Sequence, residues 1–283
     1  MRILVTGAFG MLGRRLCEEC RRRGHLLLPH DLPRFQLERP EDAAALLAAD
    51  HPDQVIHAAA LTDVDGCEAR AEEALLINGI ASGVLARAAE RLGARFLYIS
   101  SDYVFDGRKA GAYLEDDPCA PLSAYGRSKL RGELETQAWG ATVVRLSWSF
   151  GPEGRNFAAT IARKLLDGES LKVVDDQRGA PTYTRDSAAA ILDVAEKRAE
   201  GIYHCCNAGQ TSWFGFAREI TRLMGQAPER IAPCSSAEFP RPAPRPANSL
   251  LGGRRLAELR GPLPAWEDAL ARYLEEEGWL SPH

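Results

Sequence analysis

A tyrosine and a lysine, Tyr125 and Lys129, stand four residues apart in the run YGRSK, which reads as the start of a helix. Residues at i and i+4 share one helical face, so the phenol and the ammonium would point the same way. A neighbouring cation favours the phenolate and would lower the tyrosine pKa from its usual value of about 10. Such a phenol could exchange a proton with a carbonyl or an alcohol near neutral pH. Because such pairs also arise by chance on solvated helices, the interpretation depends on the rest of the chain.

A pair of serines follows a predicted strand upstream of that helix. The run 95–99 (RFLYI) is mostly apolar and predicts a buried strand, and Ser100 and Ser101 come directly after it. A hydroxyl at the carboxyl end of such a strand can hydrogen-bond the oxygen of a carbonyl substrate. We therefore predict that Ser101 is catalytic together with Tyr125 and Lys129. The alternative is that the two serines merely end the strand.

A glycine-rich turn follows the first predicted strand, residues 2–6. Gly7, Gly10 and Gly13 recur at intervals of three and open a helix that should reach about Gly24. In this setting the first glycine permits a tight turn, the second lets backbone approach a pyrophosphate, and the third lets helix pack on strand. The N-terminus of the helix adds unpaired N–H groups and the positive end of its dipole. The turn therefore predicts dinucleotide binding.

The predicted cofactor site also draws on the ends of the second and third strands, residues 25–29 and 54–57. Asp31 lies roughly 20 residues beyond the glycines, where an acid binds the adenosine ribose and would repel a 2′-phosphate. Arg34 could instead receive that phosphate, and Asp31 could also be an exposed loop residue. The predicted cofactor is NADPH or NADH. Its predicted binding residues are Gly7, Phe9, Gly10, Met11, Leu12, Gly13, Asp31, Ala58, Ala59, Ala60, Tyr125 and Lys129.

Composition limits the classes of function. The 283 residues suffice for one large α/β domain or for a large domain with a smaller lobe. A formal net charge of -4 offers no general attraction to nucleic acid or an anionic membrane, and no apolar run resembles a membrane span or signal peptide. We expect a cytoplasmic protein without such partners. The seven cysteines are scattered, which indicates free thiols, and His57 is more typical of a core residue than of a ligand.

Further motifs agree in order and spacing with one enzyme family. They are residues 101–107 (SDYVFDG), 145–148 (RLSW), 156–157 (NF), 176–182 (DQRGAPT) and 245–249 (RPANS). With the glycine motif, Tyr125 and Lys129, the chain resembles an extended short-chain dehydrogenase/reductase. More narrowly it resembles the dTDP-4-dehydrorhamnose reductases, across nearly its whole length. The resemblance implies an α/β fold, a doubly wound parallel (Rossmann) sheet with a smaller C-terminal substrate-binding lobe.

The resemblance also implies roles for individual side chains. Tyr125 would be the proton donor, Lys129 would assist it, and Ser101 stands where the family has Thr or Ser. Trp148 could offer an apolar face to a deoxysugar ring, or it could be a core tryptophan. Arg245 could bind the diphosphate if the proline-rich run around it closes over the site and is not an exposed linker. The implied substrate-binding residues are Ser101, Asp102, Tyr103, Trp148 and Arg245.

The order of predicted elements sets the expected domains. Residues 1–146 would form the dinucleotide-binding domain and 185–206 would return to it, whereas 147–184 and 207–283 would mainly build the substrate-binding lobe. Some bacterial members of the family have a glutamate on the first helix that supports a metal-bridged dimer. Arg14 and Arg15 occupy that turn here, so we predict no metal site. The chain is expected to be a monomer or a homodimer.

Together these features predict reduction of the C4 keto group of a dTDP-4-keto-6-deoxyhexose by NAD(P)H, from dTDP-4-dehydrorhamnose to dTDP-rhamnose. The partner would be the dTDP-sugar substrate. Two alternatives stay open. One is a nucleotide-sugar epimerase that retains tightly bound NAD. The other is a non-catalytic regulatory subunit of the methionine adenosyltransferase type.

Overall fold

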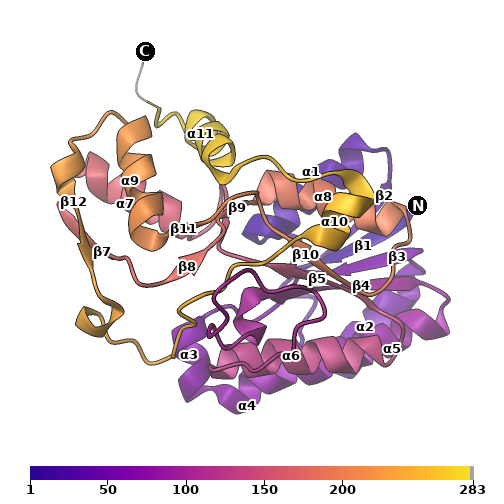
Figure 1. Ribbon diagram of the computed structural model, residues 1–283. Coiled ribbons are helices and arrows are strands. Elements are labelled where there is room, and N and C mark those ends of the chain that lie inside the picture. Colours follow the sequence, from indigo (N-terminus) through magenta and orange to yellow (C-terminus); the bar gives the residue numbers. More distant parts are fainter. Residues whose placement is uncertain (281–283) are drawn as a thin grey trace.

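A six-stranded parallel sheet lies at the centre of the computed structural model, which describes residues 1–280 (Figure 1). Its strand order is β10-β5-β4-β3-β1-β2, and every neighbouring pair is parallel. This sheet confirms the predicted α/β class. Its strands are β1 (Arg2–Thr6), β2 (Leu26–His30), β3 (Gln54–His57), β4 (Arg95–Ser101), β5 (Thr142–Leu146) and β10 (Ile202–Cys205).

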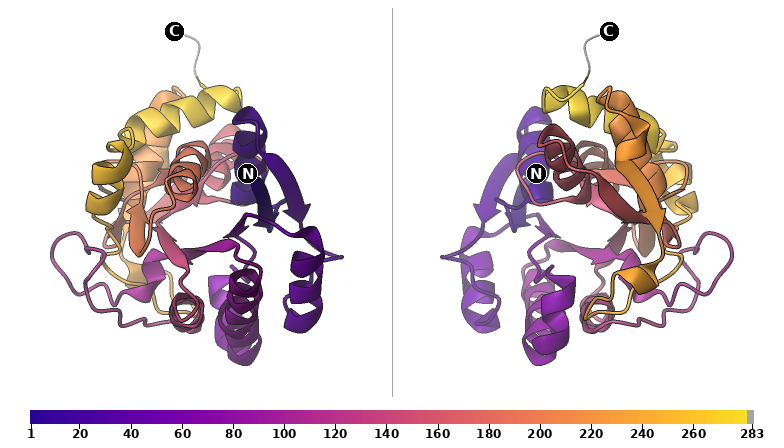
Figure 2. Two further views of the ribbon diagram at one scale, coloured as in Figure 1. Left: turned by 90° about the vertical axis from the view of Figure 1, so that its right-hand side faces the viewer. Right: turned by 90° about the vertical axis from the view of Figure 1, so that its left-hand side faces the viewer.

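Helices cover both faces of the sheet (Figures 1 and 2). One face packs against α1 (Met11–Arg22), α8 (Thr184–Glu196) and α10 (Arg254–Arg260). The other face packs against α2 (Pro40–Asp50), α5 (Ala81–Arg91) and α6 (Ala124–Gln137). Within β4, Leu97 and Ile99 enter the first core, and Phe96 and Tyr98 enter the second. Because side chains alternate along a strand, burial on both faces requires the continuous apolar runs seen in the sequence.

The long helical stretch before β4 is interrupted by a π-helical turn. It consists of α4 (Ala71–Ala74), a π segment (Leu75–Ile80) and α5. The side chain of Asn78, in the π segment, bonds both backbone groups of Leu61. Its Oδ1 accepts from Leu61 N at 2.8 Å, and its Nδ2 donates to the Leu61 carbonyl oxygen at 3.0 Å. Its Nδ2 also donates to Ser128 Oγ on α6. The π turn thus aims Asn78 at the loop after β3, and apolar periodicity gives no sign of it.

A second lobe is built around an aromatic core from residues far apart in the chain. Phe150, Tyr183, Phe216, Trp266 and Tyr273 are buried there against one another. Its helices are α7 (Phe157–Leu166), α9 (Trp213–Leu223) and α11 (Trp266–Glu276). Its strand pairs are β6 (Ser149–Phe150) with β9 (Thr182–Tyr183), β7 (Leu171–Val174) with β12 (Ile231–Cys234), and β8 (Arg178–Gly179) with β11 (Thr211–Ser212).

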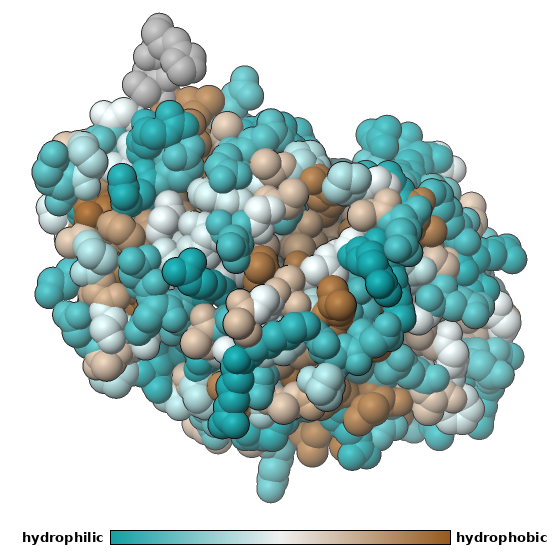
Figure 3. All heavy atoms as spheres, in the orientation of Figure 1, coloured by the Kyte–Doolittle hydropathy of each residue, from teal (hydrophilic) through white to brown (hydrophobic). Residues whose placement is uncertain are grey.

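The remaining elements are short. They are α3 (Val64–Ala69) and the 3₁₀ turns Asp102–Val104, Pro228–Arg230 and Ser236–Glu238. All seven cysteines are free, as predicted, and no helix within residues 1–280 is both long and apolar enough to cross a membrane. On the face seen in Figure 3, hydrophilic side chains predominate and apolar ones form only small groups.

Candidate active site

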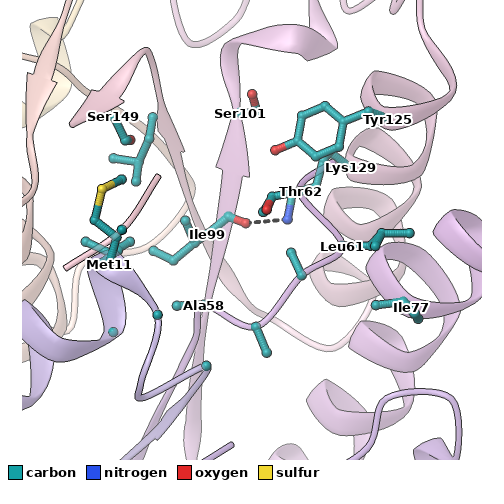
Figure 4. A pocket seen from close by; sticks show the side chains of 18 of the residues that line it. Met11, Ala58, Leu61, Thr62, Ile77, Ile99, Ser101, Tyr125, Lys129 and Ser149 are labelled. Carbon is teal, nitrogen blue, oxygen red and sulfur yellow. Dashed lines mark hydrogen bonds between the residues drawn. The ribbon is translucent and has the colours of Figure 1, made fainter. Parts of the chain in front are cut away.

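A cavity of about 980 Å³ opens at the carboxyl ends of the strands, between the sheet and the second lobe (Figure 4). Such a position is where parallel α/β sheets bind ligands. The cavity contains every predicted site residue except Arg245. Those that line it are Gly7, Phe9, Gly10, Met11, Leu12, Gly13, Asp31, Ala58, Ala59, Ala60, Ser101, Asp102, Tyr103, Tyr125, Lys129 and Trp148.

The glycine turn has no room for side chains. Gly7 has a φ of +66°, and a Cβ atom on it would lie 2.8 Å from the amide nitrogen of Ala59. A Cβ on Gly13 would lie 1.8 Å from the carbonyl oxygen of Gly7. Gly10, the N-cap of α1, provides no side-chain cap. The first N–H groups of α1 are therefore available to an anion at the cavity wall, and this donor set fits a pyrophosphate.

Asp31 is fixed at the cavity wall by two backbone amides. Its Oδ2 accepts from Phe9 N at 2.7 Å and its Oδ1 from Leu32 N at 2.8 Å. The Phe9 side chain is 58% exposed, and Arg34 is exposed and has no hydrogen bond or ion pair within residues 1–280. Asp31 is therefore a carboxylate held at the cavity wall, with the exposed Arg34 three residues further along the chain.

Tyr125 and Ser101 meet because α6 starts at the carboxyl end of β4. Ser123 caps the helix by accepting from Gly126 N at 3.1 Å, so Tyr125 lies in the first turn. A Cβ on Gly126 would lie 2.2 Å from the Tyr103 carbonyl oxygen, so the helix can approach this closely only with a glycine. The Tyr125 side chain and Ser101 point toward the same part of the cavity (Figure 4).

The predicted lowering of the Tyr125 pKa is wrong for this structure. Burial raises the pKa of Tyr125 above its ordinary value, and the neighbouring Ser101 hydroxyl only partly opposes this. Lys129 Nζ donates to the Ile99 carbonyl oxygen at 2.7 Å and lies 4.2 Å from the ring centroid of Tyr98. Burial also lowers the pKa of Lys129 to about 7. The four-residue spacing correctly placed Tyr125 and Lys129 on one face of the helix, but burial has the largest effect on the pKa of both side chains.

Asp102 is a buried carboxyl group that receives two serine hydroxyls. Ser101 Oγ donates to its Oδ1 at 2.9 Å and Ser147 Oγ to its Oδ2 at 3.1 Å. Burial raises the pKa of Asp102 to about 6, although its serine partners act in the opposite direction. The group can therefore change charge close to physiological pH.

Trp148 enters the cavity from the second lobe, stacked on another tryptophan. The ring centroids of Trp148 and Trp213 are 3.5 Å apart, and the two rings are nearly parallel. The Trp148 Nε1 donates to Ser249 Oγ at 3.1 Å. Its backbone φ is +43°, and a Cβ on Gly179 would lie 2.4 Å from the Trp148 ring. The two rings therefore form one apolar wall. Trp213 was not predicted, since no motif surrounds it.

The comparisons with known proteins point to one family. Residues 1–278 match the family described as the RmlD substrate binding domain. The chain belongs to this family. A dTDP-4-dehydrorhamnose reductase from Burkholderia thailandensis is 41% identical, with 95% of this chain and 97% of that protein covered.

Solved structures of this family share the whole fold. The crystal structure of a dTDP-4-dehydrorhamnose reductase from Clostridium acetobutylicum superposes with a TM-score of 0.93 at 37% identity, covering 98% of this chain and 100% of that chain. The enzyme of the same name from Bacillus anthracis, solved in complex with NADP, has a TM-score of 0.93 at 34% identity, covering 97% and 99%. The doubly wound fold predicted from sequence is therefore confirmed.

In this RmlD-family chain, Arg245 lies outside the cavity. Its Nη1 and Nη2 each lie 3.0 Å from one oxygen of Asp65, and Ala243 N donates to the same carboxylate at 3.2 Å. Arg241 adds a contact at 3.5 Å. The proline-rich run is therefore anchored to the loop after β3, and its arginine is already neutralised. The sequence suggested that the Arg245 guanidinium could bind a phosphate, but its spacing could not show that the guanidinium would bind the Asp65 carboxylate in this structure.

Ion pairs occupy the first turns of α1. Arg14 Nε lies 3.1 Å from a Glu153 carboxylate oxygen, and the buried Arg15 reaches Glu18 at 2.6 Å and Glu276 at 3.1 Å. Across residues 1–280, no three His, Cys, Asp or Glu side chains are grouped so that they could hold a metal ion.

His57 lies in the core and bonds Thr6 and Ser82, as its position suggested.

Proposed function

We propose that this chain is an NAD(P)H-dependent oxidoreductase that reduces the C4 keto group of dTDP-4-dehydrorhamnose to give dTDP-rhamnose. The observation that carries the proposal is the meeting of Ser101, Tyr125 and Lys129 in the same cavity as the glycine turn. The names of the relatives support the substrate, and the NADP complex of the Bacillus anthracis enzyme supports the cofactor. The enzyme acts in the cytoplasm as a monomer or a homodimer.

The chain's own residues hold the cofactor. The pyrophosphate lies against the backbone of the turn from Gly7 to Gly13, where a Cβ would clash. Asp31 binds the adenosine ribose hydroxyls, and Ala58 to Ala60 let the nucleotide approach the ends of the strands. When bound, the reduced nicotinamide supplies the hydride that reaches C4 of the sugar.

Tyr125 and Ser101 act on the substrate oxygen. Ser101 hydrogen-bonds the carbonyl oxygen as negative charge develops, and Tyr125 gives it a proton. The raised pKa of Tyr125 fits this direction, because an acid must be protonated before the reaction. Lys129 lies one turn along the same helix and stabilises the tyrosinate that is left.

The sugar lies between the two lobes. Trp148, backed by Trp213, presents an apolar face to the deoxysugar ring, and Asp102 and Tyr103 also line the cavity. Arg245 would have to exchange Asp65 for phosphate before it could bind the diphosphate. The tryptophan pair is therefore the part of the site that we assign to recognition of the substrate's sugar ring.

Turnover with a defined substrate tests the proposal. The purified chain is mixed with dTDP-4-dehydrorhamnose and either NADH or NADPH, and the product is identified by nuclear magnetic resonance. We expect stoichiometric cofactor oxidation and a new C4 hydroxyl group with the configuration of rhamnose. Interconversion of sugars without net cofactor consumption would instead identify an epimerase. Absence of turnover by protein that still binds NADP would favour the non-catalytic alternative.

A further inference from the structure

Helix α6 contacts the end of β4 at successive turns. Tyr125, Lys129 and Glu133 recur every four residues and so share one face of the helix. Lys129 Nζ donates to the carbonyl oxygen of Ile99 at 2.7 Å, and Glu133 Oε1 accepts from Ser100 Oγ at 2.6 Å. Glu133 thus continues the row that begins with the proposed acid, at the end farther from the cavity.

Glu133 forms a closed ion pair with Arg145 of β5. Arg145 donates from Nε to Oε1 at 2.8 Å and from Nη2 to Oε2 at 2.7 Å, and both side chains are 2% exposed. Arg145 stands directly beside Ser100 in the β4–β5 ladder. The carboxylate therefore joins one helix and two strands at a single level of the sheet.

The surroundings of Arg145 hold this pair in one geometry. Its guanidinium lies 5.0 Å from the ring centroid of Phe105, 3.2 Å from His204 Nε2 and 3.2 Å from Cys119 Sγ. Burial lowers the pKa of His204 to about 3, so this imidazole stays neutral. A buried ion pair often contributes no more stability than well-packed apolar residues would, so stability alone does not account for it.

Glu133 lies one turn beyond Lys129 on the same face of α6, and its negative charge favours the charged form of Lys129. Burial lowers the pKa of Lys129 to about 7, and Glu133 is the group that opposes the lowering. The other titratable groups facing this ammonium are Tyr98 on β4, His57 on β3 and Tyr125 on its own helix. Both Tyr98 and His57 are fully buried in their neutral forms, so neither supplies negative charge.

We propose that Glu133, held in place by Arg145 and Ser100, is a positioning residue for the reduction that acts through Lys129. The inference rests on the proposed function of Tyr125 and Lys129. Glu133 itself lies outside the cavity and touches neither substrate nor cofactor. Its carboxylate maintains the ammonium that stabilises the developing tyrosinate. Without it, Lys129 would lose its proton at a lower pH.

Glu133→Gln tests this, with single-turnover hydride transfer measured from about pH 6 to about pH 9. Glutamine keeps an oxygen for Ser100 but removes the charge. We expect the rate to fall most at high pH, by about tenfold, with the pH at which it declines lowered by about one unit. Nucleotide-sugar binding should change by less than about threefold. Glu133→Asp restores the charge and should restore the pH profile.

Two further variants separate charge from folding. Glu133→Gln/Arg145→Met leaves no unpaired guanidinium in the core and serves if the single variant fails to fold. Because the opposite charge of Arg145 is removed as well, its profile should shift in the same direction but by less. Glu135→Gln removes a partly exposed carboxylate of the same helix, which pairs with Arg131, and should behave as wild type. A loss of equal size at every pH, or rates within about twofold of wild type throughout, would overturn the proposal.

A readout without turnover distinguishes this inference from the proposed function. The Lys129 side chain is titrated by nuclear magnetic resonance of isotope-labelled lysine, with Lys129→Met identifying its signal. In Glu133→Gln the titration should move to lower pH. An unmoved titration would refute the role of Glu133, whereas an inactive wild-type enzyme with a shifted titration would refute only the reaction.

Discussion

Lys129 donates its 2.7 Å hydrogen bond to the backbone carbonyl of Ile99, whereas Tyr125, one turn earlier on α6, points to the same part of the cavity as Ser101. The ammonium is thus held by β4 at a fixed place in the cavity wall. The phenol stays protonated because burial raises its pKa, and this is the form that a proton donor requires. The resting site is therefore set for reduction of a carbonyl.

Tyr125→Phe keeps the ring but removes the proton donated to the substrate oxygen. Hydride transfer in a single turnover should fall by about 10²–10⁴-fold, while nucleotide-sugar and cofactor binding change little. Tyr113→Phe is a matched control, because Tyr113 stacks on Phe105 and bonds Asp106 outside the cavity. Near-normal transfer by Tyr125→Phe would mean that another group is the acid.

NADH should serve at least comparably to NADPH. Asp31 is held as an acceptor of two backbone N–H groups where the adenosine ribose would lie, and its charge would repel a 2′-phosphate. Steady-state kinetics with both cofactors check this. Asp31→Ala should shift the preference toward NADPH, and Arg34→Ala should shift it toward NADH. A wild-type preference for NADPH of several hundredfold would contradict the expectation.

Magnesium should not drive dimerisation. Arg14 and Arg15 place positive charge on the first turns of α1, already paired with Glu153 and Glu18. A magnesium cluster would need oxygen ligands there. Sedimentation velocity with magnesium and with a chelator should give the same molecular mass. A monomer that becomes a dimer only with magnesium would show that ligands lie elsewhere.

Asp102 should make stability depend on pH. Burial raises its pKa from 3.8 to about 6, so the folded protein binds this proton more tightly than the unfolded chain. The stability from this protonation is complete below the unfolded pKa and is lost as pH rises through the folded one. At alkaline pH, Asp102→Asn should therefore stabilise the fold, by up to about 3 kcal/mol, and this gain should vanish under acid conditions.

Chemical denaturation at several pH values measures this effect. Asp106→Asn provides a control of opposite sign, because backbone and tyrosine donors lower the pKa of Asp106. That variant should lose stability at neutral pH and approach wild type in acid. If Asp102→Asn raised the free energy of unfolding equally at every pH, ionisation of the Asp102 carboxyl group would not be what destabilises the fold.

The sequence predicted what depends on neighbours along the chain. Gly7 and Gly13 revealed the turn because its backbone tolerates no side chain, and the runs of β1 and β4 revealed strands buried on both faces. It could not predict pairings set by distant segments. Trp213 against Trp148, and Asp65 against Arg245, join residues far apart whose meeting depends on how the lobes close.

The π segment Leu75–Ile80 also has an evolutionary consequence. A π turn is equivalent to one residue inserted into an α-helix, and each residue advances the helix by about 100°. Deleting one residue there would restore ordinary helical geometry but rotate Asn78 away from Leu61 or Ser128, which it now joins. Length variation should therefore be rarer in this helix than in surface loops of the same lineage.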